Sequence, residues 1–366
     1  MKAIYLNLQR IDGFSGYQKK VQSQIKSFKK HNIDIELVDQ NRLEEKDASL
    51  SVLSTYKRRK AILSLCEKRI EEIKPDFIYV RYPCGDPVYY RFVKKYAGQI
   101  VSEHQTLETM ELKAEKKRLK YWMEKVYGKK ILGRIRGIVA VTGEIAKFQN
   151  SRVKNALPYH IMGNGIDAEM VPFDDRLPDY SGELNLLIVA NINLWHGIDR
   201  VIKGIAAYQG TKKVIFHVVG NGGIIEDLKK LATDLGITDK IIFYGAKRGP
   251  ELDEIYGKCH IGIGSLGIHR LGFTEGAVLK NREYCAKGLP FVYAFRDPDF
   301  KQDFLYGLEL PQNDEGIEIQ KIIDFYDDIR RETDFKETMR TYASKELSWD
   351  FKVKKIIEFI KSLEIS

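Results

Sequence analysis

The amino-acid sequence predicts an α/β protein built from two doubly wound, Rossmann-like domains, each with a parallel sheet covered by helices on both faces. Three observations predict this class. The chain of 366 residues is long enough for two cores, at about 150 residues per domain. Short apolar runs of strand length alternate with longer amphipathic segments from end to end, as in βαβ units. One stretch rich in Gly, Pro and Asp, residues 161–182, separates two such series and is the best linker.

The first series begins at the amino terminus. The apolar run 3–8 is expected to form a strand, residues 9–16 a loop, and residues from 17 to about 30 a helix. Further strands of this series are expected at 33–38, 77–80, 100–102 and 137–141. Nearly continuous apolar strands of this kind are typical of parallel sheets. The second series has expected strands at 184–192, 213–220, 240–245, 260–265 and 289–295.

Composition and charge exclude several classes of protein. A hydrophobic content of 43%, with 29 Gly, 10 Pro and no low-complexity tract, excludes collagen-like, disulfide-scaffold and wholly disordered chains. The formal net charge is +9, and residues 1–170 carry 33 Lys/Arg against 20 Asp/Glu. We therefore expect the first half to face an anionic partner, which charge alone leaves open between nucleic acid, a membrane and a phosphorylated small molecule.

The cysteines and the apolar segments bear on location. The four cysteines are far apart and show no metal-ligand spacing, which favours a reducing compartment. The amino terminus lacks the apolar segment of a signal peptide, and there is no run of about 20 apolar residues to span a bilayer. We expect a cytoplasmic protein that is at most peripheral on the inner face of the cell membrane.

Three glycine-containing turns follow predicted strands or precede predicted helices. They are Gly13–Gly16, Gly220–Gly223 and Gly272–Gly276. Such turns expose backbone N–H groups at helix N-termini, where the dipole favours an anion, although each could equally be a plain tight turn. None is a Walker A loop. Because doubly wound sheets bind ligands at the carboxyl ends of their strands, the cleft between the two domains is the expected active site.

The most specific pattern of candidate functional residues is a pair of carboxylates. Glu275 and Glu283 are eight residues apart, which would place them roughly on one face of a helix over 277–287. Lys280 lies between them. The alternative is an acidic residue that stabilises the helix N-terminus and a surface Lys–Glu pair.

The glycine loop, the two glutamates and the following Gly288-Leu-Pro290 together resemble the donor-site signature of retaining glycosyltransferases of family 4 (glycosyl transferases group 1). The resemblance implies a GT-B architecture, in which two Rossmann-like domains face a central cleft. Residues 1–165 would bind the acceptor, residues 166–349 would bind the nucleotide sugar, and a helix over about 350–366 would cross back onto the first domain. Other segments resemble family motifs in order along almost the whole chain: Gly13–Gly16, Val139–Thr142, Gly163–Asp167, Leu186–Gly197 and Ser348–Trp349.

The resemblance also implies roles for single residues. Glu283 would hold the ribose hydroxyls, since a carboxylate accepts two hydrogen bonds from a vicinal diol, and Glu275 would contact hydroxyls of the donor sugar. His104 matches a histidine that the family places near the sugar; the alternative is an ordinary loop histidine. His104 and Glu275 are therefore the candidate catalytic residues, and Arg81 and Tyr82 are candidates for contact with the acceptor. Further candidate donor-binding residues are Gly16, Gly220, Asn221, Gly222, Gly276 and Ala277.

Two departures from the family pattern concern the positive charge at the leaving diphosphate. The usual Arg and Lys are replaced by Asn191 and His196. A protonated His196 could supply the charge, as could Arg200, Arg270 or Lys280. Lys280 is favoured because it would lie on the donor helix close to both glutamates.

The function that the resemblance implies is transfer of a sugar, with retention, from a UDP- or GDP-sugar to a glycan or lipid-linked saccharide in bacterial surface polysaccharide or glycoconjugate synthesis. No cofactor and no metal are expected, since the formal DxD of Asp297-Pro-Asp299 looks like a loop turn. Two alternatives stay open. One is a GT-B-fold sugar-nucleotide epimerase or phosphorylase. The other is a nucleic-acid-binding protein, which has only the charge in its favour and no recognisable motif, so nucleic acid is not the expected partner.

A basic amphipathic stretch lies in the first half. Residues 111–136 hold ten Lys/Arg and three acidic residues, with apolar residues at spacings near three and four. Such a segment with Trp122 and Tyr127 can lie on an anionic membrane surface. The alternative is a helix whose apolar stripe packs on the domain core.

Overall fold

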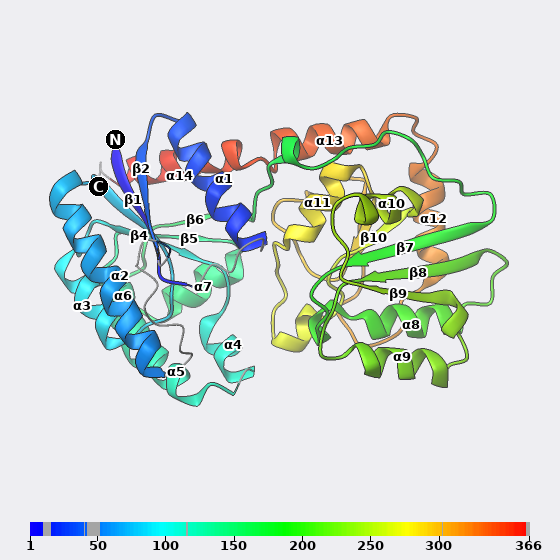
Figure 1. The fold of residues 1–366 in the computed structure, drawn as a ribbon, viewed down its shortest axis with the longest axis horizontal. Helices are drawn as coiled ribbons and strands as arrows, with labels where there is room; N and C mark the ends of the chain where they lie inside the picture. Colours follow the sequence, from blue (N-terminus) through cyan, green and yellow to red (C-terminus); the bar gives the residue numbers. More distant parts are fainter. Residues whose placement is uncertain (10–15, 40, 42–51, 115, 302, 364–366) are drawn as a thin grey trace. The chain divides into compact units, whose positions relative to one another are not determined.

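The computed structural model describes the whole chain except residues 10–15, 40, 42–51, 115, 302 and 364–366. Its contacts divide the chain into two compact units. Unit 1 consists of Met1–Gly163 and Trp349–Ser366, and unit 2 of Asn164–Ser348. Each unit contains a six-stranded sheet whose strands pair in parallel. The predicted pair of doubly wound α/β folds is therefore confirmed (Figure 1).

The sheet of unit 1 has the strand order β2-β1-β3-β4-β5-β6 (Figure 1). Its strands are β1 (Lys2–Asn7), β2 (Asp34–Val38), β3 (Phe77–Arg81), β4 (Ile100–His104), β5 (Gly137–Ala140) and β6 (Tyr159–Ile161). Its helices are α1 (Gly16–Lys30), α2 (Val52–Ile73), α3 (Pro87–Lys95), α4 (Glu108–Ala114), α5 (Arg118–Met123), the π-helical turn η2 (Glu124–Gly128), α6 (Lys129–Leu132), α7 (Gly143–Ser151) and the carboxyl-terminal α14 (Trp349–Ser362).

Helices α1 and α14 cover one face of this sheet. Tyr5 of β1 and Tyr79 of β3 belong to one apolar cluster with Trp349 of α14. The two helices also share polar contacts, since Ser27 Oγ donates to Asp350 Oδ1 at 2.7 Å. The alternate strand residues, which point to the other face, are equally buried, so both faces carry a core: Ile4, Leu6, Ile78 and Val80.

The sheet of unit 2 has the order β12-β11-β10-β7-β8-β9. Its strands are β7 (Glu183–Val189), β8 (Lys213–Val219), β9 (Ile241–Gly245), β10 (Ile261–Ile263), β11 (Phe291–Tyr293) and β12 (Gly307–Glu309). Its helices are α8 (Ile198–Ala207), α9 (Ile225–Asp234), α10 (Pro250–Lys258), α11 (Leu279–Lys287), α12 (Ile319–Ile329) and α13 (Phe335–Lys345), with the short turns η3 (Ala168–Met170), η4 (Leu194–His196), η5 (Thr238–Lys240) and η6 (Ile268–Leu271).

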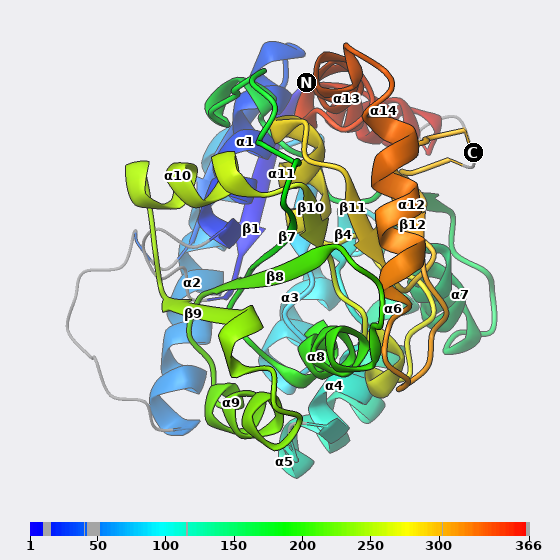
Figure 2. The ribbon, with the colours of Figure 1, turned by 90° about the vertical axis from the view of Figure 1, so that its right-hand side faces the viewer.

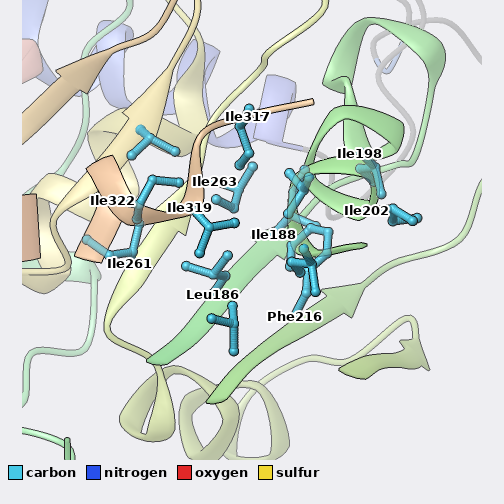
Figure 3. Close-up of a cluster of buried hydrophobic side chains, with 14 of the residues drawn as sticks. Leu186, Ile188, Ile198, Ile202, Phe216, Ile261, Ile263, Ile317, Ile319 and Ile322 are labelled. Carbon is cyan, nitrogen blue, oxygen red and sulfur yellow. The ribbon is translucent and has the colours of Figure 1, made fainter. Parts of the chain in front are cut away.

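Two apolar clusters cover the two faces of the second sheet. Leu186 and Ile188 of β7 pack with α8, α9 and α12 (Figure 3). Leu187, between them in the sequence, packs with α10, α11 and α13. Figure 2 shows α8 and α9 on one side of β8 and α10 and α11 on the other. Strand residues therefore alternate between two cores, which explains why these strands are apolar at nearly every position.

In each sheet, the strands that follow the first one along the chain lie first on one side of it and then on the other. In unit 1, β2 and β3 pair on opposite sides of β1. In unit 2, β8 and β9 lie on one side of β7, and β10 lies on the other. At such a switch point the loops that follow the two strands diverge and leave a crevice for a ligand at the carboxyl edge of the sheet. The carboxyl ends of β1 and β3, and of β7 and β10, are therefore the candidate ligand sites.

Candidate functional site

The loops after β7 and β10 pack on each other at the switch point of unit 2. Leu266 N donates to His196 O at 3.0 Å, and Gly267 N donates to Trp195 O at 3.1 Å. Gly197 joins η4 to α8 with φ +64, and a Cβ there would lie 2.8 Å from the Cβ of Leu266. The position therefore requires glycine. Helix α8, which starts immediately after it, has no side-chain cap.

The Gly220–Gly222 turn lies against the same strand end. Gly220 N donates to Gly245 O at 2.8 Å, and Ile192 N donates to Asn221 O at 2.7 Å. A Cβ on Gly220 would meet Ala190 O at 1.8 Å, and one on Gly222 would meet Ile192 O at 2.0 Å. The predicted loop residues Asn191, Gly220, Asn221 and Gly222 are thus brought together at the ends of β7 and β8.

Lys280 of α11 reaches this part of the edge. Its Nζ lies 3.5 Å from Ser265 Oγ, in the loop after β10. Burial lowers the pKa of Lys280 to about 7, and no carboxylate among the described residues forms an ion pair with it. A buried ammonium without a counter-ion is costly, and an anionic ligand would offset that cost.

His196 is neutral, which corrects the expectation that it could carry a proton. Asn193 N–H donates to its Nδ1 at 3.0 Å, so this nitrogen holds no proton. Burial, followed by the charge of Lys280, lowers the pKa of His196 to about 2. The histidine can contact a ligand here only as a neutral ring.

The two candidate arginines bind other groups of the protein. This corrects the expectation that Arg200 or Arg270 supplies the positive charge at the diphosphate. Buried Arg200 donates to the carbonyls of Leu266 (2.5 Å) and Pro311 (3.0 Å) and to other groups of the 313–315 loop. Arg270 forms two 2.8 Å hydrogen bonds to Asp199 and one of 2.6 Å to Asp314. Of the proposed cations, Lys280 is the one without a carboxylate or carbonyl partner in the described structure.

The expectation that Glu275 and Glu283 share a helix face is wrong. Helix α11 begins at Leu279, and Glu275 forms an isolated parallel bridge with Arg296. The two side chains also form an ion pair. Gly276 N donates to Arg296 O at 3.0 Å, so its amide is not available to a diphosphate.

The open amide at this position is the next one along the chain. Ala277 N–H has no acceptor among the described residues, and α11 has no side-chain cap at Val278. Backbone N–H groups therefore stay available at the start of α11, next to Lys280. Glu283 is half-buried one helical turn further on. Its contact with ribose stays a prediction.

Arg282 holds the segment that precedes α11 and is a residue that sequence reasoning missed. It is fully buried and forms ion pairs with Asp297 and Asp299. Its Nε donates to Asn164 O at 3.0 Å, and Asn164 Nδ2 donates to Ala277 O at 2.6 Å. Both carboxylates of the formal DxD are thus bound by an arginine. The Asp297-Pro-Asp299 motif could have predicted this role, because two carboxylates in a turn beside a buried helix need a counter-charge.

The carboxyl edge of unit 1 brings His104 and Tyr82 together. His104, at the end of β4, is fully buried, and its ring stacks on Tyr82 with 4.3 Å between the centroids. Tyr82 is buried, and its hydroxyl donates to Glu124 at 3.0 Å. This corrects the expectation that Tyr82 contacts the sugar acceptor. Arg81 is half-buried and donates to Gln9 Oε1 at 3.1 Å. Gly16 begins α1, while the loop residues 13–15 lie outside the described residues.

A buried ion pair at the edge of unit 1 was also missed. Lys20 of α1 lies 2.9 Å from Glu103 of β4, and both side chains are almost fully buried. Lys20 also donates to Gln105 Oε1 at 2.6 Å. Burial, opposed by Glu103, lowers the pKa of Lys20 to about 8.

The basic stretch 111–136 forms parts of α4, α5, η2 and α6. Leu112 and Ile131 are buried, whereas Leu119 and Trp122 of α5 are each 60% exposed. Helix α5 has no buried residue, so its apolar side chains do not contribute to the core. None of the described helices is long and apolar enough to cross a bilayer.

Comparisons with known proteins concern the family segment and the fold. Residues 173–294, within unit 2, match the family model of glycosyl transferases group 1. An uncharacterized glycosyltransferase of Methanocaldococcus jannaschii is 27% identical over 123 residues, 32% of this chain and 31% of that protein. The match thus spans about a third of the curated relative.

Solved structures match over the whole chain. The lipopolysaccharide outer core galactosyltransferase WaaB is 16% identical, with a TM-score of 0.67 and 99% of both chains covered. Anabaena HepE in complex with UDP-glucose is 14% identical, with a TM-score of 0.61 over 99% of this chain and 100% of that one. The chain has the GT-B fold. The group 1 segment contains two of the three glycine turns, Gly220–Gly223 and Gly272–Gly276, together with Lys280 and Glu283. Gly13–Gly16 and His104 lie outside it.

Proposed function

We propose that this GT-B chain is a glycosyltransferase whose unit 2 binds the nucleoside diphosphate of an activated sugar. The observation that carries the proposal is Lys280, a buried lysine without a carboxylate partner at the β7/β10 switch point. Three features of the same edge support it: the uncapped start of α8, the uncapped start of α11, and the open amide of Ala277. The match of residues 173–294 to glycosyl transferases group 1 gives the reaction class.

The chemistry follows from the charge that develops on the leaving group. Cleavage of the bond between sugar and diphosphate leaves negative charge on the diphosphate, and donors fixed in advance stabilise it most effectively. Lys280 supplies one full charge, and the helix N-termini supply partial charges. We propose that this set works without a metal ion and that the sugar is transferred with retention of configuration.

The proposed donor is a UDP- or GDP-sugar, with Glu283 on the ribose. UDP is the first choice because HepE, a protein of the same fold, is described in complex with UDP-glucose. The proposed acceptor is a glycan or a lipid-linked saccharide of a bacterial surface polysaccharide or glycoconjugate, and the proposed location is the cytoplasmic side of the membrane. WaaB, named as a lipopolysaccharide galactosyltransferase, supports this pathway class.

The test is calorimetric titration with UDP, GDP and their sugars. Lys280→Met should weaken diphosphate affinity by about 10- to 100-fold, the loss expected for a charge-assisted hydrogen bond. The matched control is Lys287→Met, on the same helix, because Lys287 is paired with Asp253 at 2.8 Å. Glu283→Ala should weaken nucleoside diphosphates but not inorganic diphosphate. Absence of binding for every nucleotide and nucleotide sugar would overturn the proposed function.

We also propose that α5 attaches the protein to an anionic membrane. Leu119 and Trp122 are exposed and are surrounded in the sequence by Lys116, Lys117 and Lys120, the composition of an interfacial segment. Sedimentation with phosphatidylglycerol vesicles at low and high salt tests this. Exchange of Leu119 and Trp122 for serine should abolish pelleting at low salt. Leu305→Ser, at a residue of unit 2 that is 61% exposed, is the control, and wild-type protein that stays in the supernatant at low salt would contradict the proposal.

A further inference from the structure

The residue at which the chain enters unit 2 is bonded to the segment before α11. Unit 2 begins at Asn164. The side-chain amide of Asn164 donates to Ala277 O at 2.6 Å, and its backbone carbonyl accepts from Arg282 Nε at 3.0 Å. Arg282 also donates to Val278 O at 3.2 Å. Asn164 is therefore attached, by its side chain and by its backbone, to the residues at the start of α11.

These bonds fix the chain on both sides of the open Ala277 amide. Before it, Gly276 N donates to Arg296 O at 3.0 Å, and a Cβ on Gly276 would lie 2.9 Å from Phe295 Cδ2. After it, the Ala277 carbonyl accepts from Asn164. An amide whose neighbours are held in this way can bind an anion without first being ordered, so binding loses little conformational entropy.

Both connections between the two units start from one place on unit 2. The chain enters unit 2 at Asn164 and leaves it after Ser348. Ile166 and Ser348 form an isolated parallel bridge, and Ile166 N donates to Leu347 O at 2.9 Å. We call these paired stretches, residues 164–166 and 347–348, the connecting segments. The side chain of Asn164 thus attaches the connecting segments to the residues before α11.

We propose that Asn164 is a positioning residue of the diphosphate site. Its side-chain amide holds the Ala277 peptide so that the Ala277 N–H stays available to the diphosphate, and it thereby couples the bound diphosphate to the connecting segments. This inference rests on the proposed function, because it takes the ligand of unit 2 to be a nucleoside diphosphate. Asn164 acts through Ala277 and does not itself touch the ligand.

The coupling follows from mass action. An opening of the connecting segments that separates Asn164 from Ala277 also disorders the diphosphate site. A ligand that binds only the closed form makes this opening rarer by a factor of 1 + [L]/Kd. The Ile166 N–H reports the opening, because its bond to Leu347 O must break before the hydrogen exchanges with solvent.

One labelling scheme isolates the Ala277 amide. The sequence contains two Gly-Ala pairs, Gly245-Ala246 and Gly276-Ala277. Protein made with ¹³C-carbonyl glycine and ¹⁵N alanine therefore gives two signals in an HNCO spectrum, and Ala246→Ser assigns them. The signal of Ala277 then reports directly on this amide, with and without ligand.

The test variant is Asn164→Ala, which removes the donor to Ala277 O. The matched control is Asn150→Ala in unit 1. Asn150 Nδ2 also donates to a backbone carbonyl of another segment, that of Leu157, at 3.2 Å. The control therefore makes the same chemical change to the same kind of bond, at a residue outside the proposed site.

Three results are expected. Without ligand, Asn164→Ala should shift the Ala277 signal, and Asn150→Ala should leave it unchanged. Inorganic diphosphate should move the wild-type Ala277 signal, and calorimetry should show about fivefold weaker affinity in Asn164→Ala, the effect of one neutral hydrogen bond, with no change in Asn150→Ala. At about 100 times the Kd of each protein, diphosphate should slow exchange of the Ile166 N–H by about 10- to 100-fold in the wild type, and much less in Asn164→Ala.

Each measurement can overturn the proposal. An Ala277 signal that is identical in wild type and Asn164→Ala would show, without ligand, that Asn164 does not hold this peptide. Equal diphosphate affinity in the two proteins would remove the positioning role. Exchange at Ile166 that bound diphosphate leaves unchanged would remove the coupling, and this test needs the wild type alone, even if Asn164→Ala fails to fold. Absence of all diphosphate and nucleotide binding would instead count against the proposed function, because the ligand-free Ala277 signal tests the Asn164 bond separately.

Discussion

The carboxyl edges of the two sheets each hold a buried lysine, and the surroundings of the two lysines differ. Lys20 in unit 1 lies 2.9 Å from Glu103, and its pKa falls to about 8 because burial outweighs this carboxylate. Lys280 in unit 2 has a serine hydroxyl at 3.5 Å, and burial alone lowers its pKa to about 7. One lysine has its counter-ion within the protein, and for the other we propose an anionic ligand in that place.

The helices that follow β3 and β5 in unit 1 differ in the same way from three helices of unit 2, although α5 and α6 of unit 1 also start without a side-chain cap. In unit 1, Asp86 caps α3 by accepting from Val88 N and Tyr89 N, and Thr142 caps α7 by accepting from Ile145 N. In unit 2, α8, α9 and α11 start without a side-chain cap. Two parallel six-stranded sheets, with different strand orders, thus differ in whether these helices and the buried lysine have partners within the protein. This difference supports the proposal that unit 2 binds an anionic ligand.

The largest effect is expected from Arg282, which holds the segment before α11. Arg282→Met leaves Asp297 buried without its counter-charge, and we expect a loss of about 3–5 kcal/mol in the free energy of unfolding of unit 2. Urea unfolding followed by circular dichroism measures it. The double variant Arg282→Met/Asp297→Leu should recover most of the loss, because it removes the two fully buried charges and keeps only that of the less buried Asp299. Equal stability of the two variants would show that the unpaired carboxylate is not the cause.

The fold class followed from the sequence because both faces of each sheet bury apolar side chains, which makes the strands apolar along their length. Strands β6 and β12 were missed because each has three residues at a partly exposed edge. The site was harder to predict. The start of α11 was misplaced because Glu275 and Gly276 bond to Arg296, a contact between chain segments that helix periodicity does not show. Pairs such as Lys20–Glu103 follow no spacing rule for the same reason.

A smaller effect, which depends on pH, is expected at Lys280. Its pKa is about 7 in the folded state and about 10.4 in the unfolded state, so the unfolded chain binds more protons between these values. Wild-type stability therefore gains from this group as pH rises from 7 to about 10. Lys280→Met removes the cost of the buried charge and should raise the free energy of unfolding by a few kcal/mol at pH 6, since one pKa unit corresponds to about 1.4 kcal/mol.

The advantage of Lys280→Met should shrink as pH rises towards 10, which urea titrations at pH 6, 8 and 10 can follow. Lys287→Met, at a lysine paired with Asp253, should show no such trend. A constant difference between Lys280→Met and wild type across this range would contradict the buried, unpaired state of Lys280 and with it the contrast to Lys20.

The smallest effect concerns the cap of α7 and tests whether this helix N-terminus of unit 1 has its acceptor within the protein. Thr142 Oγ1 accepts from Ile145 N at 3.3 Å. Thr142→Ala should cost about 1 kcal/mol of stability, the usual value for a lost cap, whereas Thr142→Ser keeps the oxygen and should cost much less. Because this N-terminus already has its acceptor, neither variant should change the affinity for UDP. A Thr142→Ala protein that loses no stability but binds UDP differently would place a ligand at this helix and would remove the distinction between the two edges.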